Sequence, residues 1–137
     1  MSEARYLLDT SVYSQPLKAR PLWKVLERWQ SEGDKACAVC GVVVAEVEYG
    51  LHRSGSVKRW RMYRDELLGR LKIVPMDSGV WRRFAETRAR QQSAGQTMDD
   101  FDLLIAATAL EHGLIVATLN VRHFSMIAGL IWEDWSE

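Results

Sequence analysis

Short apolar runs alternate with longer segments of helical periodicity along this chain, and the alternation predicts a parallel β-sheet. Four runs are expected strands: Arg5–Leu8, Ala36–Val39, Leu114–Ala117 and the edge strand Leu130–Trp132. A fifth run, Leu71–Pro75, is a short strand or an extended link. Parallel neighbours need a crossover connection, which is usually a helix. We therefore expect an α/β fold built from βαβ units.

The longer segments read as helices. Leu22, Val25, Leu26 and Trp29 recur at helical spacings after Pro21. Further helices are expected at about 42–51, 57–68, 77–92 and 99–112, and residues 120–127 form a loop or a short helix. Gly113 is a natural C-terminal stop for the helix before it. The chain contains no repeat or linker, so 1–137 is expected to be a single domain.

Composition and the N-terminus favour a cytoplasmic protein. The chain is 47% hydrophobic and 26% charged, as in ordinary globular proteins. No apolar run approaches the roughly 20 residues that a membrane-spanning helix needs. Met1–Arg5 leads into a strand rather than into the apolar core of a signal peptide. We expect no membrane association.

Charge is unevenly distributed, although the formal net charge is zero. Residues 53–90 carry eleven Lys and Arg against four Asp and Glu, a local balance of +7, and the remainder is −7. A basic surface beside an acidic pocket would suit an enzyme that holds phosphodiesters. The alternative is that these arginines are the solvated faces of two amphipathic helices.

Cys37 and Cys40 form a Cys-x-x-Cys pair, which can indicate half of a zinc site or a redox motif. The chain has no second pair, and its three histidines are scattered. The pair lies in a strand-like run, where residues three apart point to opposite faces. We therefore interpret both as buried free thiols.

Three acids stand in apolar segments and suggest a shared divalent-cation site. Asp9 closes the first strand, Glu46 lies in an apolar helix, and Asp102 opens another. A carboxylate in apolar surroundings is costly unless it is paired or bound to a metal. Singly, Asp9 could be a turn residue, Asp102 an N-terminal helix charge and Glu46 half of an ion pair. The set of three favours the metal site.

These acids are expected to meet at one rim of the sheet. Ligands of open parallel sheets bind beyond the carboxyl ends of the strands, where Asp9 and Asn120 should lie. Asp102 falls in the first turn of its helix, and Glu46 lies about one turn into its own. Oxygen ligands suit Mg²⁺ or Mn²⁺. Such a site can activate water to hydrolyse a phosphodiester.

In their surroundings, the three acids resemble those of the PIN-domain family, most closely its VapC-type toxins. The matching segments are Leu8–Ser11, Ala45–Gly50, Asp100–Ala109, Gly113–Asn120 and Gly129–Trp135. Their order and spacing agree over essentially the whole chain. An isolated Asp-Thr-Ser would mean little, but the ordered set is specific.

The resemblance implies a three-layer α/β/α sandwich with a five-stranded parallel sheet. It also implies a Mg²⁺- or Mn²⁺-dependent ribonuclease, acting as the toxin of a toxin–antitoxin pair, that forms a homodimer and is blocked by a cognate antitoxin. Asp9, Glu46 and Asp102 would be the catalytic, metal-binding acids. The hydroxyls that would orient them belong to Thr10, Ser11 and Thr118. Glu48 fits the family position less well than Glu46.

One position departs from the family pattern. Many PIN domains have a fourth acid where this chain has Asn120. An amide oxygen can still bind a metal or orient a water, but it adds no charge. Asp100 is the better candidate to supply the missing charge. Asp99 is better explained as a helix N-cap.

Two other functions remain open. The chain could be a catalytically weak or inactive PIN-fold module that binds RNA or protein, which Asn120 favours. It could also be a metal-dependent DNA nuclease or phosphatase. If the substrate is RNA, possibly tRNA, basic residues could follow its backbone: Arg59, Arg61, Arg64, Arg82 and Arg83. Trp60 or Tyr63 could stack on a base, although core or dimer contacts explain them better.

Overall fold

A computed structural model describes residues 4–137 and shows a five-stranded sheet in the order β3-β2-β1-β4-β5. The strands are β1 (Tyr6–Leu8), β2 (Cys37–Cys40), β3 (Lys72–Val74), β4 (Ile115–Thr118) and β5 (Trp132–Asp134). Every pair of neighbours is parallel. The chain builds outward from β1 to β3 and then returns to the other side of β1. The predicted fold class is confirmed.

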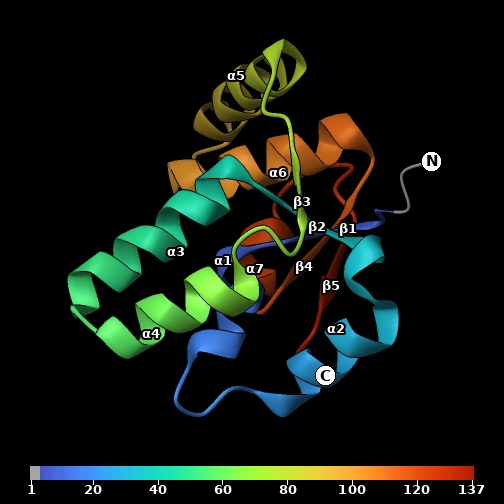
Figure 1. Cartoon of the computed structure of the whole chain (residues 1–137). Coiled ribbons are helices and arrows are strands. Elements are labelled where there is room, and N and C mark those ends of the chain that lie inside the picture. The colour runs from blue at the N-terminus through green and yellow to red at the C-terminus, as the bar shows by residue number, and fades with distance from the viewer. Residues whose placement is uncertain (1–3) are drawn as a thin grey trace.

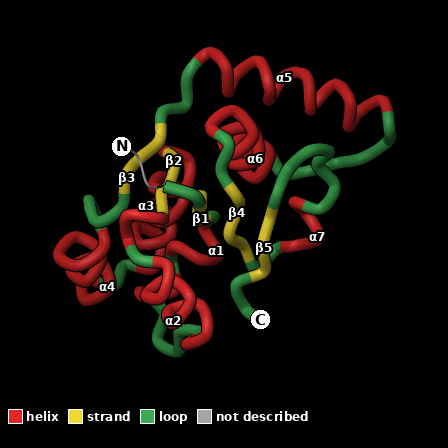
Figure 2. The backbone as a smooth tube through the Cα atoms, turned by 90° about the vertical axis from the view of Figure 1, so that its right-hand side faces the viewer, coloured by secondary structure: helices red, strands yellow, loops and turns green. Residues whose placement is uncertain are grey.

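Helices lie on both sides of the sheet (Figure 1 and Figure 2). They are α1 (Thr10–Tyr13), α2 (Trp23–Glu32), α3 (Gly41–Ser54), α4 (Val57–Met62), α5 (Ser78–Ser93), α6 (Asp100–His112) and α7 (Val121–Phe124). The 3₁₀ turns are η1 (Gln15–Leu17) and η2 (Asp34–Ala36), and a π-helical turn, η3 (Tyr63–Leu67), continues α4. Gly113 ends α6 in the left-handed conformation, as predicted.

The core forms where the two helical layers meet the central strands. All residues of β1 and β2 are buried, which is the expected pattern for a parallel sheet covered on both faces. Helix α6 is buried along most of its length. Cys37 and Cys40 are buried and free, as predicted. The thiol pKa of each is raised by burial.

The last edge strand is present as predicted, but its bounds were placed two residues too early. We expected Leu130–Trp132, but β5 begins at the end of that run, and Ile131 is 64% exposed. Inside the strand, Oε1 of Glu133 accepts a 2.6 Å hydrogen bond from Nη2 of Arg28 on α2. This ion pair links the edge strand to a helix far away in the sequence, and local hydropathy cannot reveal such a contact.

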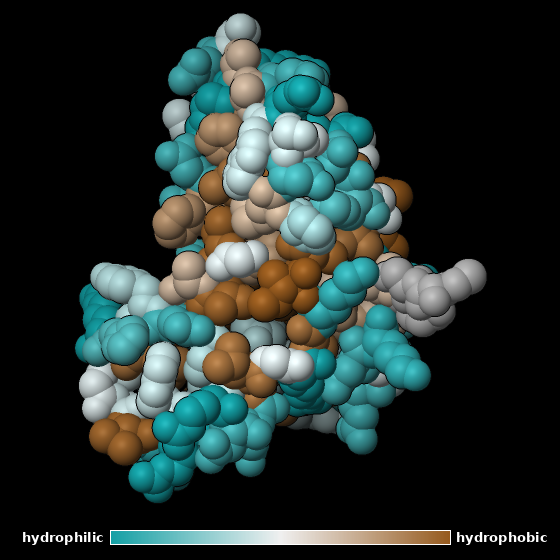
Figure 3. Space-filling model, turned by 45° about the horizontal axis from the view of Figure 1, so that its top comes forward, coloured by the Kyte–Doolittle hydropathy of each residue, from teal (hydrophilic) through white to brown (hydrophobic). Residues whose placement is uncertain are grey.

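One face of the molecule carries an apolar patch. Figure 3, in which the α5 end comes toward the viewer, shows apolar side chains gathered in the middle of that face. The exposed large hydrophobic residues include Ile73 in edge strand β3 and Trp81 in α5. Within residues 4–137, no helix is both long and apolar enough to cross a membrane.

Candidate active site at the carboxyl edge of the sheet

The candidate site lies at the point where the strand order of the sheet reverses. Strand β1 pairs with β2 on one side and with β4 on the other, so the switch point of the sheet lies between β1 and β4. This is the position at which open parallel sheets bind ligands. Asp9 follows β1 directly, and Asn120 stands two residues after β4.

Asp9 is the most deeply buried of the predicted acids, with 1% of its surface exposed. It caps the N-terminus of α1, and its Oδ1 accepts hydrogen bonds from Val12 N (3.1 Å) and Ser11 Oγ (2.6 Å). Its Oδ2 accepts a 2.5 Å bond from Thr118 Oγ1 on β4. Burial raises the pKa of Asp9 to about 6 despite these bonds, and the charge of Asp102 adds to the rise.

Glu46 reaches the same rim from α3. Thr10 Oγ1 donates a 2.6 Å hydrogen bond to Oε1 of Glu46, which joins α3 to α1 beside Asp9. Partial burial raises the pKa of the Glu46 carboxyl. The hydrogen bond from Thr10 lowers this pKa, and the charges of Asp102 and Asp99 raise it further. Glu46 therefore belongs to the same electrostatic cluster as Asp102.

Asp102 completes the set from the first turn of α6. Burial raises its pKa, a hydrogen bond with His123 opposes the rise, and the nearby charge of Asp99 adds to it. Nδ1 of His123, on α7, lies 3.0 Å from Oδ2 of Asp102. The sequence interpretation did not identify His123, because its segment gave only a loop or short-helix signal.

The donor set fits a hard divalent cation. Within residues 4–137, no Lys or Arg forms an ion pair with Asp9, Glu46 or Asp102. A nearly buried carboxylate with like charges nearby is costly without a positive counter-charge. In the same part of the chain, no three His, Cys, Asp or Glu side chains are gathered closely enough to hold a metal ion together. Mg²⁺ usually keeps several waters and takes only one or two protein carboxylates, so a complete cage is not required.

Of the two neighbouring aspartates, Asp100 does not take the role that we expected and Asp99 does. The carboxylate of Asp100, our candidate for the missing charge, is 73% exposed and forms an ion pair with Arg88 of α5. Asp99 caps α6, as predicted, by accepting hydrogen bonds from the amides of Phe101 and Asp102. Asp99, rather than Asp100, is the residue whose charge acts on the cluster. The sequence explained Asp99 as a helix cap, so its effect on the pKa values of Glu46 and Asp102 was not predicted.

Asn120 is linked to Asp9 through Thr118, whereas Glu48 is engaged elsewhere. The Asn120 amide nitrogen donates a 2.8 Å hydrogen bond to Thr118 Oγ1, but the Asn120 side chain makes no N-cap bond to α7. Glu48 accepts a 2.6 Å hydrogen bond from Tyr63 Oη, so it joins α3 to the π-helical turn. Tyr63 is fully buried and is unavailable for stacking on a base. Its phenol pKa is raised by burial and by Glu48.

The predicted basic surface is divided between separate parts of the molecule. Figure 1 places α4 at the lower left and α5 at the top. Arg83 pairs with Glu111, and Arg64 contacts Asp65. Trp60 packs against the rings of His52 and Tyr63. Of the five predicted arginines, Arg59 lines a pocket that also includes Thr10 and Glu46.

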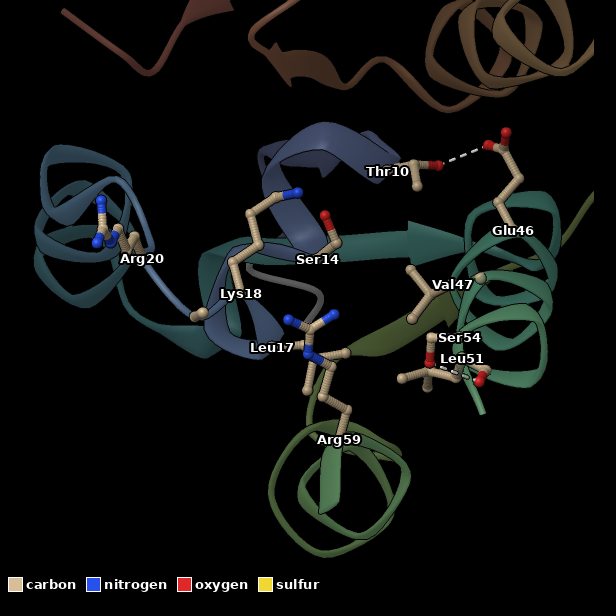
Figure 4. A pocket seen from close by; sticks show the side chains of 12 residues that line it. Thr10, Ser14, Leu17, Lys18, Arg20, Glu46, Val47, Leu51, Ser54 and Arg59 are labelled. Atoms are coloured by element: carbon tan, nitrogen blue, oxygen red, sulfur yellow. Dashed lines mark hydrogen bonds between the residues drawn. The ribbon is translucent and has the colours of Figure 1, made fainter. Parts of the chain in front are cut away.

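A pocket of about 580 Å³ begins at Thr10 and Glu46 and extends between η1, α3 and α4 (Figure 4). Its basic lining comes from Lys18, Arg20 and Arg59. Lys18 and Arg20 lie outside the segment whose composition is basic, so charge counting along the sequence missed them. They follow η1, a 3₁₀ turn that hydrophobic periodicity did not predict.

Comparison with known proteins gives a consistent result over nearly the whole chain. A family model described as PIN domain matches residues 6–130. The chain is 31% identical over 131 residues to "Ribonuclease VapC2" of Haemophilus influenzae, covering 96% of this chain and 98% of the relative. It is 30% identical over 132 residues to "tRNA(fMet)-specific endonuclease VapC" of Shigella flexneri, with the same coverage.

Solved structures show the same architecture. The crystal structure of FitAcB from Neisseria gonorrhoeae has a TM-score of 0.85 at 27% identity, covering 95% of this chain and 97% of the other. VapBC2 from Rickettsia felis, bound to a DNA fragment from the promoter, has a TM-score of 0.80 at 26% identity, with 95% and 98% coverage.

Proposed function

Because the chain belongs to the PIN-domain family, we propose that it is the ribonuclease toxin of a toxin–antitoxin pair, formed by one domain over residues 1–137. The proposal is supported by two relatives whose names describe a ribonuclease and a tRNA(fMet)-specific endonuclease. The observation that carries the proposal is the burial of Asp9 at the switch point of the sheet, under the charge of Asp102 and without a cationic partner within residues 4–137.

The catalytic acids would be Asp9, Glu46 and Asp102, and Mg²⁺ or Mn²⁺ would bind among them with several waters completing its coordination. The cation would supply an activated water and positive charge for the scissile phosphate. Thr118 and Ser11 fix both oxygens of Asp9, and Thr10 fixes Glu46. These hydroxyls hold the carboxylates in place before substrate arrives, so little reorganisation is needed.

We further propose two protein partners. An antitoxin would neutralise the three carboxylates with a basic side chain, because within residues 4–137 no Lys or Arg forms an ion pair with them and His123 contacts only Asp102. A homodimer would cover the exposed apolar side chains of Ile73 and Trp81, since an exposed edge strand readily pairs with another chain. We propose that the protein is cytoplasmic and binds both partners there.

The alternative is a PIN-fold module that binds RNA or protein without cutting. The observation that favours it is Asn120, which brings no charge to the rim and has an exposed side chain. Fewer negative charges would weaken the binding of a second cation. Retention of three acids with their orienting hydroxyls favours the nuclease.

The test is cleavage of total tRNA by the purified protein and by an Asp9→Asn variant, with EDTA, Mg²⁺ or Mn²⁺. We expect discrete fragments that require both the metal and Asp9. Calorimetric titration with Mn²⁺ provides a second readout, in which the variant binds more weakly. A folded protein that neither binds Mn²⁺ nor cuts would support the binding module.

A further inference from the structure

The charge of the lining residues changes along the pocket beside the acids. At one end lie Glu46 and Thr10, which belong to the candidate site. Lys18, Arg20 and Arg59 line the remainder. In the view of Figure 4, Arg59 rises from α4 and Lys18 extends from the segment after η1 toward Ser14, both on the side of the pocket opposite α3. The groove therefore changes from negative to positive with distance from the reacting centre.

Its cations are available for a ligand. Lys18, Arg20 and Arg59 are exposed, and none has a side-chain ion pair or hydrogen bond within residues 4–137. Other arginines on the surface are already paired, as Arg83 is with Glu111. Three unpaired cations along one groove create a positive potential that attracts a chain of negative groups.

The floor of the groove is apolar. Leu17 comes from η1, and Val47 and Leu51 come from successive turns of α3. Each is mostly buried, at 5 to 8% exposure, yet each contributes to the lining. An apolar floor beneath a cationic wall suits a polymer whose charged backbone alternates with flat rings. Single-stranded nucleic acid has this character.

We propose that this groove holds the single-stranded RNA segment on one side of the cut, with successive phosphates at Arg59 and Lys18. A base rests on Leu17, Val47 and Leu51, and Arg20 extends the track at the far end. The inference rests on the proposed nuclease function. The scissile phosphate would lie beside Glu46, and the RNA chain continues from it. Because Glu46 also lines the groove, the adjoining nucleotides can enter it. An acidic peptide would also pair with the cations, but nothing would place its charge at the acids.

Binding can be measured without cleavage. The probe is a fluorescein-labelled oligouridylate of about eight nucleotides, within the range of single-strand site sizes, titrated in EDTA by fluorescence anisotropy at several salt concentrations. The variant Lys18→Ala/Arg59→Ala removes two proposed phosphate contacts. The matched control, Lys24→Ala/Arg90→Ala, removes the same charge from exposed positions on α2 and α5.

Each single-strand phosphate contact contributes about 0.7 to the salt slope, or about fivefold in affinity at roughly 0.1 M salt. We expect the groove variant to bind about 25-fold more weakly at that salt concentration, with a slope lower by about 1.4. The control should stay within about twofold of the wild type, because its charges lie outside the groove. Circular dichroism would verify that both variants remain folded.

The outcomes separate the two proposals. Absence of oligonucleotide binding by the wild type, or equal losses in both variants, would overturn the groove. The groove proposal would also be overturned if the groove variant bound RNA as well as the wild type but captured a co-expressed antitoxin more weakly. That result would assign the groove to a protein segment. Loss of RNA binding confined to the groove variant supports the groove proposal. That result stands even if the wild type cuts no tRNA, which would contradict the nuclease alone.

Discussion

Thr118 Oγ1 donates a 2.5 Å hydrogen bond to Asp9 Oδ2 across 109 positions of sequence. The same oxygen accepts a hydrogen bond from the backbone N–H of Asn120. One buried hydroxyl thus couples the ends of β1 and β4 to the loop that follows. A change at Thr118 should alter the metal site without touching a carboxylate.

Thr118→Val tests this coupling, because valine preserves the shape and removes both hydrogen bonds. We expect Mn²⁺ affinity to fall about 10- to 100-fold, the usual effect of losing a group that orients a ligand. Stability should fall by about 1–3 kcal/mol. The control is Thr108→Val, since Thr108 is equally buried and donates to Leu104 O within α6. Calorimetry that shows equal Mn²⁺ losses in both variants would contradict the coupling.

Asp9→Asn should stabilise the metal-free protein at neutral pH. Burial raises the pKa of Asp9 from 3.8 to about 6, so the folded state favours the protonated carboxyl. The cost of ionisation is absent below pH 3.8, grows between 3.8 and about 6, and is complete above that. It amounts to at most about 3 kcal/mol.

Urea unfolding in EDTA at about pH 5 and about pH 7.5 would measure the effect. The advantage of the variant should be larger at the higher pH. Glu46 and Asp102 also have raised pKa values, but both proteins retain them, so the difference isolates Asp9. Asp65→Asn, at an exposed site, should show no comparable gain. A variant that is less stable than the wild type at the higher pH would refute the interpretation.

Glu46 and Glu48 form a matched pair, two positions apart on α3. Glu46→Gln should reduce metal-dependent tRNA cleavage at least about 100-fold, since it removes one of the acids around the reacting centre. Glu48→Gln should leave the cleavage rate nearly unchanged and lower the melting temperature, because Tyr63 Oη donates to Glu48. If Glu48→Gln abolished cleavage while the fold persisted, our choice between the glutamates would be wrong.

Asn120→Asp should strengthen divalent-cation binding. The side chain stands at the rim and is exposed, so a new carboxylate adds attraction at little desolvation cost. Coulomb attraction to a divalent ion at about 5 Å in water corresponds to roughly a tenfold gain in Mn²⁺ affinity. Calorimetric titration of the variant beside the wild type measures it. Weaker binding would indicate that the amide oxygen is itself a better ligand at this position.

The sequence predicted the sheet well because the signals that define it are local. Buried strands read as apolar runs, and Gly113 and Asp99 mark the ends of α6. It placed β5 too early, because the contact between Glu133 and Arg28 is not local. The candidate acids were identified by their apolar surroundings in the sequence and by the family resemblance. Asp99 and His123 were not assigned to the site, since their contributions depend on how α6 and α7 pack.

Strand β1 is made first but is completed by a neighbour near the other end of the chain, since β4 supplies its second pairing partner and Thr118 supplies the bond to Asp9. During synthesis on the ribosome, the growing polypeptide carries Asp9 and Glu46 long before residue 118 emerges. Until then, β1 lacks one neighbour and Asp9 lacks the hydroxyl that fixes Oδ2. A ribonuclease toxin built in this way would thus acquire its finished active site only after all but the last of the five strands have been translated.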